Sequence, residues 1–256
     1  MQINALWSKW VDTITTKINN ITDVIVHKEF PKAALLELCN EHGMIVINSW
    51  QQNSIAIEVI TSCPQTSHKD IKVQMELVED IIKIHTTFLD PKIKGMVIFN
   101  ILLPKDVAVS IMTKQGDIVI KDLNSNLHLE TLQGDIKLIN PHQTVQAKTA
   151  LGNIFIRTDS IQATEKFDLT SDKGNIEFYT TDIINCSLHA YALQGKVISE
   201  IPITLDSQTT LLNPEIWKNF KQVVHGRIGT AISHVNILAH YGSISILPYM
   251  KQNDLF

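Results

Sequence analysis

Four acidic or amide side chains each follow a recurring glycine, and together they form a candidate site for a metal ion or an acid–base reaction. They are Asp117, Asp135, Asn153 and Asn175. Side chains at matching positions of adjacent β-strands lie about 4.8 Å apart. Calcium is held in proteins by about 6 to 8 oxygen ligands, which aspartate and asparagine supply. The column could therefore hold calcium and, through it, an acidic sugar.

The same four residues have a structural interpretation. Asp and Asn are preferred at tight turns because their side chains bond to nearby backbone groups, and asparagines can also stack as an amide ladder. A lyase additionally needs a base such as Arg or Lys near the acids. The chain has only two arginines, Arg157 and Arg227, and neither falls in the column. We therefore expect turn residues here, with no catalytic residue, no metal ligand and no cofactor.

Other reactive residue types lack a catalytic or metal-binding spacing. His128 and His189 fall in one outward column with Ser110, Gln146 and Asp168, but we expect two coils between them, too far for one ion. His225, His234 and His240 show no recognisable ligand pattern. The sequence also contains no G-x-S-x-G elbow, no clustered glycines of a phosphate loop and no local signature of a catalytic cysteine. An enzyme is not expected.

The glycines belong to a 12-residue pattern with six copies between Val109 and Ile246, such as VSIMTKQGDIVI and LHLETLQGDIKL. The pattern aligns Gly116, Gly134, Gly152, Gly174, Gly195 and Gly242, and a looser seventh copy centres on Gly43. Apolar and polar residues alternate on both sides of the glycine, which indicates two short strands with one buried face each. The glycine between them predicts a corner with positive φ.

Aligned columns indicate that the copies stack side by side. Thr113, Thr131, Thr149 and Ser171 share one position, while Ile118, Ile136, Ile154 and Ile176 share another. Successive glycines from Gly116 to Gly195 are 18, 18, 22 and 21 residues apart, about the length of one solenoid coil. We predict an all-β chain with a parallel β-helix, or β-solenoid, over residues 106–250. A repeated antiparallel hairpin is the alternative.

Two segments interrupt the pattern. Residues 23–105 are predicted to form a first coil and a β-rich antiparallel insertion, with a hairpin at the VED bend between IKVQMEL and IIKIH. Whether residues 49–105 form a separate subdomain or irregular, widened coils stays open. Near 213–226 we predict a short helix, with Asn213 as N-cap, Pro214 in the first turn and Gly226 as the C-terminal stop.

The N-terminal residues 1–22 are predicted to form an amphipathic helix. Apolar residues recur there at three- and four-residue steps, at Ile3, Trp7, Trp10, Ile14, Ile18 and Ile21. We expect this helix to dock on the β-core or to cap its open end, where unpaired strand edges need cover. Peripheral membrane contact through residues 3–21 and binding of a partner are the alternatives, and the polar face is poorer in Lys and Arg than is typical of interfacial helices.

The T-x-x-G-D-I units at Thr113 and Thr131, with the segments LELCNEHGMIVINSW and GRIGTAISHVNILAHYGSISIL, resemble the putative adhesin family. This is a domain-of-unknown-function family of β-strand repeats, and the resemblance covers roughly residues 35 to 248. It implies a right-handed β-helix-like fold and no catalytic residues. The chain departs from the pattern at Lys196 and Ser243, which replace the Asp or Asn after glycine in the last copies.

Composition narrows the functional classes further. The formal net charge is −4, from 22 Lys and Arg against 26 Asp and Glu, without a basic stripe that could follow nucleic acid. The sequence contains no run of 18 apolar residues, which would indicate a transmembrane helix. The first residues lack an apolar secretion signal, and the three cysteines are far apart, so we expect a soluble, cytoplasmic protein.

The function we expect is a non-enzymatic, adhesin-like binding or scaffolding protein of unknown ligand, presented to a protein or glycan surface. A carbohydrate-active enzyme of the pectate-lyase-like type is one alternative, using the Asp117 and Asp135 column. A self-assembling structural subunit is the other, in which open solenoid edges join copies of the chain.

Overall fold

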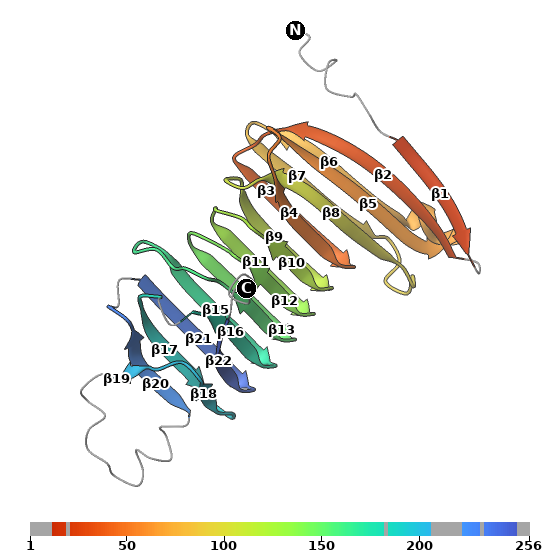
Figure 1. The fold of residues 1–256 in the computed structure, drawn as a ribbon. Helices are drawn as coiled ribbons and strands as arrows, with labels where there is room; N and C mark the ends of the chain where they lie inside the picture. The colour runs from red at the N-terminus through yellow and green to blue at the C-terminus, as the bar shows by residue number, and fades with distance from the viewer. Residues whose placement is uncertain (1–11, 19–20, 182–183, 206–221, 231–232, 250–256) are drawn as a thin grey trace, which may run out of the picture.

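The computed structural model describes residues 12–18, 21–181, 184–205, 222–230 and 233–249. These residues form two large, mostly parallel sheets whose strands lie side by side along an elongated molecule (Figure 1). The single helix among them is the 3-10 helix η1 (Gln65–Asp70). None of the described helices is long and apolar enough to cross a bilayer.

We call the two sheets A and B, and each has eleven strands. Sheet A has the spatial order β1 (Asp12–Ile18), β2 (Ile21–Pro31), β5 (Ser54–Pro64), β8 (Met96–Pro104), β4 (Ile45–Trp50), β10 (Ile118–Lys121), β12 (Ile136–Ile139), β14 (Ile154–Arg157), β16 (Ile176–Thr180), β22 (Ile244–Pro248) and β18 (Val197–Ser199). Sheet B has the order β19 (Thr204–Leu205), β20 (Val223–Ile228), β17 (Cys186–Ala192), β21 (Ser233–Tyr241), β15 (Lys166–Lys173), β13 (Val145–Leu151), β11 (Leu127–Gln133), β9 (Ala108–Gln115), β3 (Leu35–His42), β7 (Ile81–Phe88) and β6 (Ile71–Val78).

The core lies between the two sheets because each strand alternates buried and outward side chains. In β14, for example, Ile154 and Ile156 are fully buried while Phe155 faces outward. Aromatic rings join the sheets where Phe167 of β15 meets Phe178 of β16 edge to face, with ring centroids 6.5 Å apart. The inner faces therefore carry the apolar cluster, and the outer faces are left for other roles.

The predicted columns are confirmed as parallel, in-register neighbours. Ile118, Ile136, Ile154 and Ile176 pair in sequence across β10, β12, β14 and β16. The column of Thr113, Thr131, Thr149 and Ser171 on sheet B also pairs in register. Hydroxyl groups of this column form hydrogen bonds to backbone carbonyls. Thr149 Oγ1 donates to the carbonyl of Gly134 at 2.9 Å, and Ser171 Oγ donates to the carbonyl of Gly152 at 2.9 Å. Thr131 Oγ1 likewise donates to the carbonyl of Gly116 at 3.2 Å, so these three hydroxyls satisfy carbonyls of the preceding coil, whereas Thr113 Oγ1 has no hydrogen-bond partner among the described residues.

The spatial order of the coils departs from the chain order at both ends. β22 pairs with β16 on one side and with β18 on the other, so the last glycine-marked segment lies between two earlier ones. Gly242 accordingly stacks on Gly174, and Gly195 stacks on Gly242. The early strand β4 is likewise placed between β8 and β10. The expectation that successive glycine-marked segments are spatial neighbours is therefore wrong for Gly195.

The early β-rich region contains the predicted hairpin. β6 and β7 pair antiparallel from Val78 and Ile81 outward, and the two-residue turn between them has Glu79 at φ 57°. β5 pairs antiparallel with both β2 and β8. These strands are members of the same two sheets, since β8 is parallel to β4 and β7 is parallel to β3.

The predicted N-terminal helix is wrong over its described part. Asp12–Ile18 is strand β1, which pairs antiparallel with β2, and β2 begins at Ile21. The reason is a run of β-branched residues from Thr13 to Thr16, which favours extended backbone when a neighbouring strand supplies hydrogen bonds. Residues 1–11, the remainder of this prediction, lie outside the described residues.

The helix predicted near 213–226 is also wrong where it can be compared. Val223–Ile228 is strand β20, paired antiparallel with β17. Gly226 does not stop a helix, because it lies in this strand where an added Cβ would meet Ile203 and the carbonyl of Thr204. Residues 213–221 are outside the described part of the chain.

Candidate functional site

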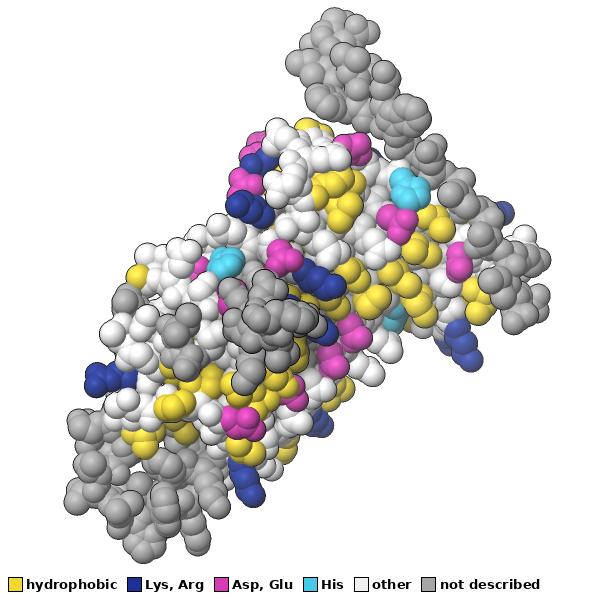
Figure 2. Space-filling model, viewed as in Figure 1, with side chains coloured by type: hydrophobic (Ala, Val, Ile, Leu, Met, Phe, Trp, Pro, Cys, Tyr) yellow, Lys and Arg dark blue, Asp and Glu magenta, His cyan; other side chains and the backbone are white. Residues whose placement is uncertain are grey.

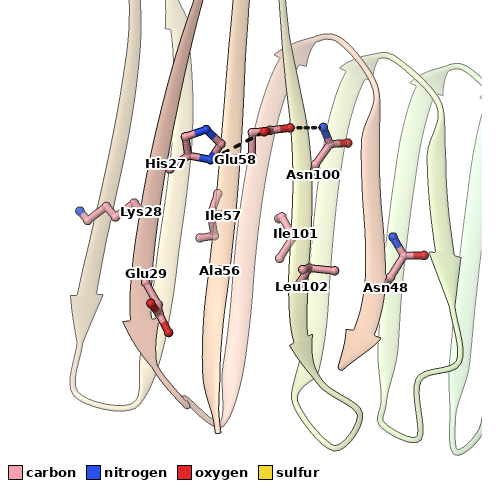
Figure 3. A pocket seen from close by; sticks show the side chains of 10 residues that line it. All are labelled: His27, Lys28, Glu29, Asn48, Ala56, Ile57, Glu58, Asn100, Ile101 and Leu102. Atoms are coloured by element: carbon pink, nitrogen blue, oxygen red, sulfur yellow. Dashed lines mark hydrogen bonds and ion pairs between the residues drawn. The ribbon is translucent and has the colours of Figure 1, made fainter. Parts of the chain in front are cut away.

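A groove of about 400 Å³ opens on the outer face of sheet A, over β2, β5, β8 and β4 (Figure 3). Figure 2 shows apolar side chains at the surface over this part of the molecule. The groove is a candidate binding site because a hollow that combines apolar floor and converging polar groups is the usual form of a ligand site.

One side of the groove is a row of three polar residues on neighbouring strands. His27 of β2 is opposite Glu58 of β5, which is opposite Asn100 of β8. Asn100 Nδ2 donates to Glu58 Oε1 at 2.6 Å, and His27 Nδ1 lies 3.7 Å from Glu58 Oε2 (Figure 3). The carboxylate is therefore held from both sides, so its position is set before any ligand arrives.

The floor of the groove exists because one of its residues is small. Ala56 lies between Glu29 and Leu102 in the next row of the sheet, and Asn48 follows Leu102. An alanine among larger neighbours leaves a hollow with an apolar floor. Carboxylate and amide groups at its rim suit a small polar ligand that has one apolar face.

The indole of Trp50 is held at the end of β4, opposite the end of β8. Trp50 is on β4, yet its Nε1 donates to the carbonyl of Ser54 on β5 at 2.8 Å, and β8 lies between those two strands. This bond fixes the indole at the strand end, where Trp50 is in register with Pro104 of β8, two residues beyond Leu102 of the groove. Aromatic surface with a satisfied N–H is typical of protein binding sites.

The reactive and charged side chains that line the groove are few in kind. Its lining residues include no serine, threonine or cysteine that could act as a nucleophile. Lys28 is turned inward, because its Nζ donates to the carbonyl of Met75 at 2.8 Å, and burial lowers its pKa. The outward charges are those of Glu29, Glu58 and, when protonated, His27.

The polar column singled out in the sequence forms a ladder along the exposed corner. The backbone N–H of Asp135 donates to Asp117 Oδ1 at 2.8 Å, and that of Asn153 donates to Asp135 Oδ1 at 2.7 Å. The N–H of Asn175 donates to Asn153 Oδ1 at 2.8 Å, and Ser243 continues the ladder from Asn175 at 2.9 Å. Each side chain thus satisfies the turn of the next coil, as the structural interpretation requires.

Metal-binding patterns among the described residues are limited. No group of three or more His, Cys, Asp or Glu is arranged to hold a metal ion within that part of the chain. His128 contacts Gln146 at 3.0 Å between Nδ1 and Oε1, and three strands, rather than the two coils expected, separate it from His189. His240 Nδ1 lies 2.7 Å from Asp172 Oδ1.

One histidine pair could not be foreseen from the sequence. His189 of β17 is directly opposite His225 of β20, and their rings stack with centroids 4.9 Å apart at 29°. The pairing depends on β20 being a strand, whereas the sequence pattern suggests the end of a helix there. Tyr191 contacts the His225 ring edge-on at 5.0 Å.

A buried ion pair also escaped the sequence reasoning. Glu165, with a side chain only 1% exposed, lies 3.5 Å from His142 across two neighbouring loops, measured from Oε1 to Nδ1. Contact with Glu165 raises the pKa of His142, against the opposing effect of burial. Burial alone would raise the pKa of Glu165, but His142 and the backbone N–H groups of Gln162 and Gln143 outweigh it and lower that pKa.

This pair makes stability depend on pH in a defined direction. The raised pKa of His142 contributes stability fully below pH 6.5, its unfolded value, and loses it as pH rises through the folded pKa. The lowered pKa of Glu165 contributes stability above pH 4.5 and loses it as pH falls through the folded pKa. Both contributions are present between these two values.

We expect His142→Gln to cost about 2 kcal/mol of unfolding free energy near pH 6, because the buried carboxylate loses a charged partner. Urea unfolding at pH 6 and pH 8.5 measures this, and the cost should shrink as pH rises through the folded pKa of His142, because the wild-type pair then loses its charge attraction. The exposed His128→Gln is the matched control. An equal cost of His142→Gln at both pH values would contradict the assignment.

Comparisons with known proteins bear on the fold. No protein-family model matches the chain, and no curated protein matches it in sequence. The crystal structure of a putative cell adhesion protein from Clostridium sporogenes aligns with a TM-score of 0.54 at 12% identity, over 94% of this chain and 99% of that one. The likeness is one of fold.

A second solved structure aligns less closely. It is a putative adhesin from Bacteroides fragilis, with a TM-score of 0.44 at 10% identity over 88% of this chain and 97% of that one. At 12% and 10% identity, these two similarities say nothing of what this chain binds. The T-x-x-G-D-I unit as a family signature stays a prediction.

Proposed function

We propose that this chain is a non-enzymatic, adhesin-like binding protein, a right-handed β-solenoid that holds its ligand in the groove on sheet A. The observation that carries the proposal is the preset row His27, Glu58 and Asn100 above the apolar floor at Ala56. Right-handed winding is the usual sense for parallel strands joined by crossovers.

Two further features support binding rather than catalysis. The glycine corner and its Asp and Asn ladder are occupied in joining one coil to the next. The outer face of sheet A is extended and rigid, because each strand between the two edge strands is hydrogen-bonded to a neighbour on either side. A rigid face can meet a ligand without the entropy cost of ordering loops.

The test is to fill the groove without touching the core. Ala56→Trp should lower binding to arrayed oligosaccharides and purified surface proteins at least tenfold, because the indole would occupy the floor. Ala150→Trp is the matched control, since Ala150 faces outward on sheet B. Both variants should unfold at the wild-type temperature.

Two outcomes would contradict the proposal. One is equal binding by Ala56→Trp and wild type to the same array positions. The other is loss of binding by Ala150→Trp alone, which would move the site to sheet B.

A further inference from the structure

Three soft or borderline metal ligands form one row on the outer face of sheet B. Cys39 of β3 is in register with Met112 of β9 on one side and with His85 of β7 on the other. Neighbouring residues of a row are about 4.8 Å apart along the sheet. Residues far apart in sequence are thereby placed side by side, with the cysteine in the middle.

All three side chains point away from the core. Each strand alternates, and the residues on either side of Cys39, Leu38 and Asn40, are buried. Cys39 and His85 are exposed, and Met112 is 56% exposed. The other two cysteines, at positions 63 and 186, are buried. The row is therefore open to an ion from solution.

The donor set decides which ion would fit. Thiolate and thioether sulfur are soft ligands that favour Cu(I), and imidazole also binds copper. The side chains of Met112 and His85 are long enough to lean over Cys39 from opposite sides. Together they offer two sulfurs and one nitrogen, which suits the low coordination number of a soft monovalent ion.

We propose that Cys39, Met112 and His85 form a surface site for Cu(I). On binding, the thiol of Cys39 releases its proton and the thiolate sulfur bonds to the ion, so one positive charge replaces another. Met112 and His85 add neutral ligands. Basic groups lie in both adjacent rows: Lys114 is held in an ion pair with Glu41 at 3.2 Å, from Nζ to Oε1, and Lys83 is two residues from His85 on β7.

The test is anaerobic titration of the full chain with Cu(I) in competition with a chromogenic chelator. We expect one equivalent bound, with one proton released. Cys39→Ser should abolish this binding. Met112→Leu and His85→Gln should each raise the dissociation constant at least tenfold.

Matched controls separate the row from general metal binding. Met96→Leu removes another methionine that is 46% exposed, and His128→Gln removes another outward histidine of sheet B. Both should bind as the wild type does. Wild-type affinity in Met112→Leu and His85→Gln would show binding by the thiol alone and overturn the site, as would the absence of stoichiometric binding.

Discussion

Gly134→Ala is expected to destabilise the protein by about 4 kcal/mol. An added Cβ would overlap the carbonyl oxygen of Gly116 in the preceding coil, and Gly134 has φ 149°, a conformation that residues with a side chain rarely adopt. Overpacking costs about 1–3 kcal/mol, and strained backbone costs about 1–3 kcal/mol. The total is a large share of the stability of an ordinary domain, about 5–15 kcal/mol.

Equilibrium unfolding in urea measures this effect. Gln133→Ala is the control, since Gln133 is the exposed neighbour of Gly134 and its substitution should change the unfolding free energy by less than about 0.5 kcal/mol. A loss below 1 kcal/mol for Gly134→Ala would mean that neighbouring coils are not in close contact at the glycine column.

The close contact at the glycines explains why the stacked columns could be predicted. Alternation around each glycine identifies the two strands, and alignment on the glycine then places Thr131 beside Thr149 and Ile136 beside Ile154. The first signal lies within one copy, and the second comes from aligning successive copies. These signals do not predict the order of the copies in space. Gly242 lies beside Gly174, although the two glycines are 68 residues apart in sequence.

The prediction of an N-terminal helix failed because its apolar spacing is ambiguous, whereas the prediction near 213–226 rested on cap residues. Apolar residues four apart, such as Trp10, Ile14 and Ile18, fit a helical face, but an even spacing also fits one face of a strand. Residues Asp12–Ile18 form a strand because they pair with the neighbouring strand β2. The segment from Val223 to Gly226 is likewise a strand because it pairs with β17.

The candidate groove could not be predicted because its residues come together only through sheet order. Glu58 and Asn100 are 42 residues apart in sequence, and His27 joins them through the antiparallel pairing of β2 with β5. The sequence shows β segments in this region but not which ones are neighbours. The same holds for Cys39 and Met112, which meet through the placement of β3 beside β9.

The placement of the last coil between two earlier ones yields an all-or-none prediction. Glu177 of β16 is in register with Ser245 of β22, and Ser245 is in register with Ile198 of β18. Glu177 and Ile198 are therefore two strand spacings apart, about 9.6 Å, while Glu177 and Ser245 are about 4.8 Å apart. All three face outward on sheet A, where cysteines would be accessible.

Cross-linking of paired cysteines tests this order of strands in sheet A. In a Cys39→Ser background, a short bifunctional thiol reagent should link Glu177→Cys to Ser245→Cys almost completely and should leave Glu177→Cys with Ile198→Cys unlinked. Mass spectrometry of the digested chain identifies the linked peptides. Efficient linkage of positions 177 and 198, without linkage of 177 and 245, would contradict the stacking described for this protein.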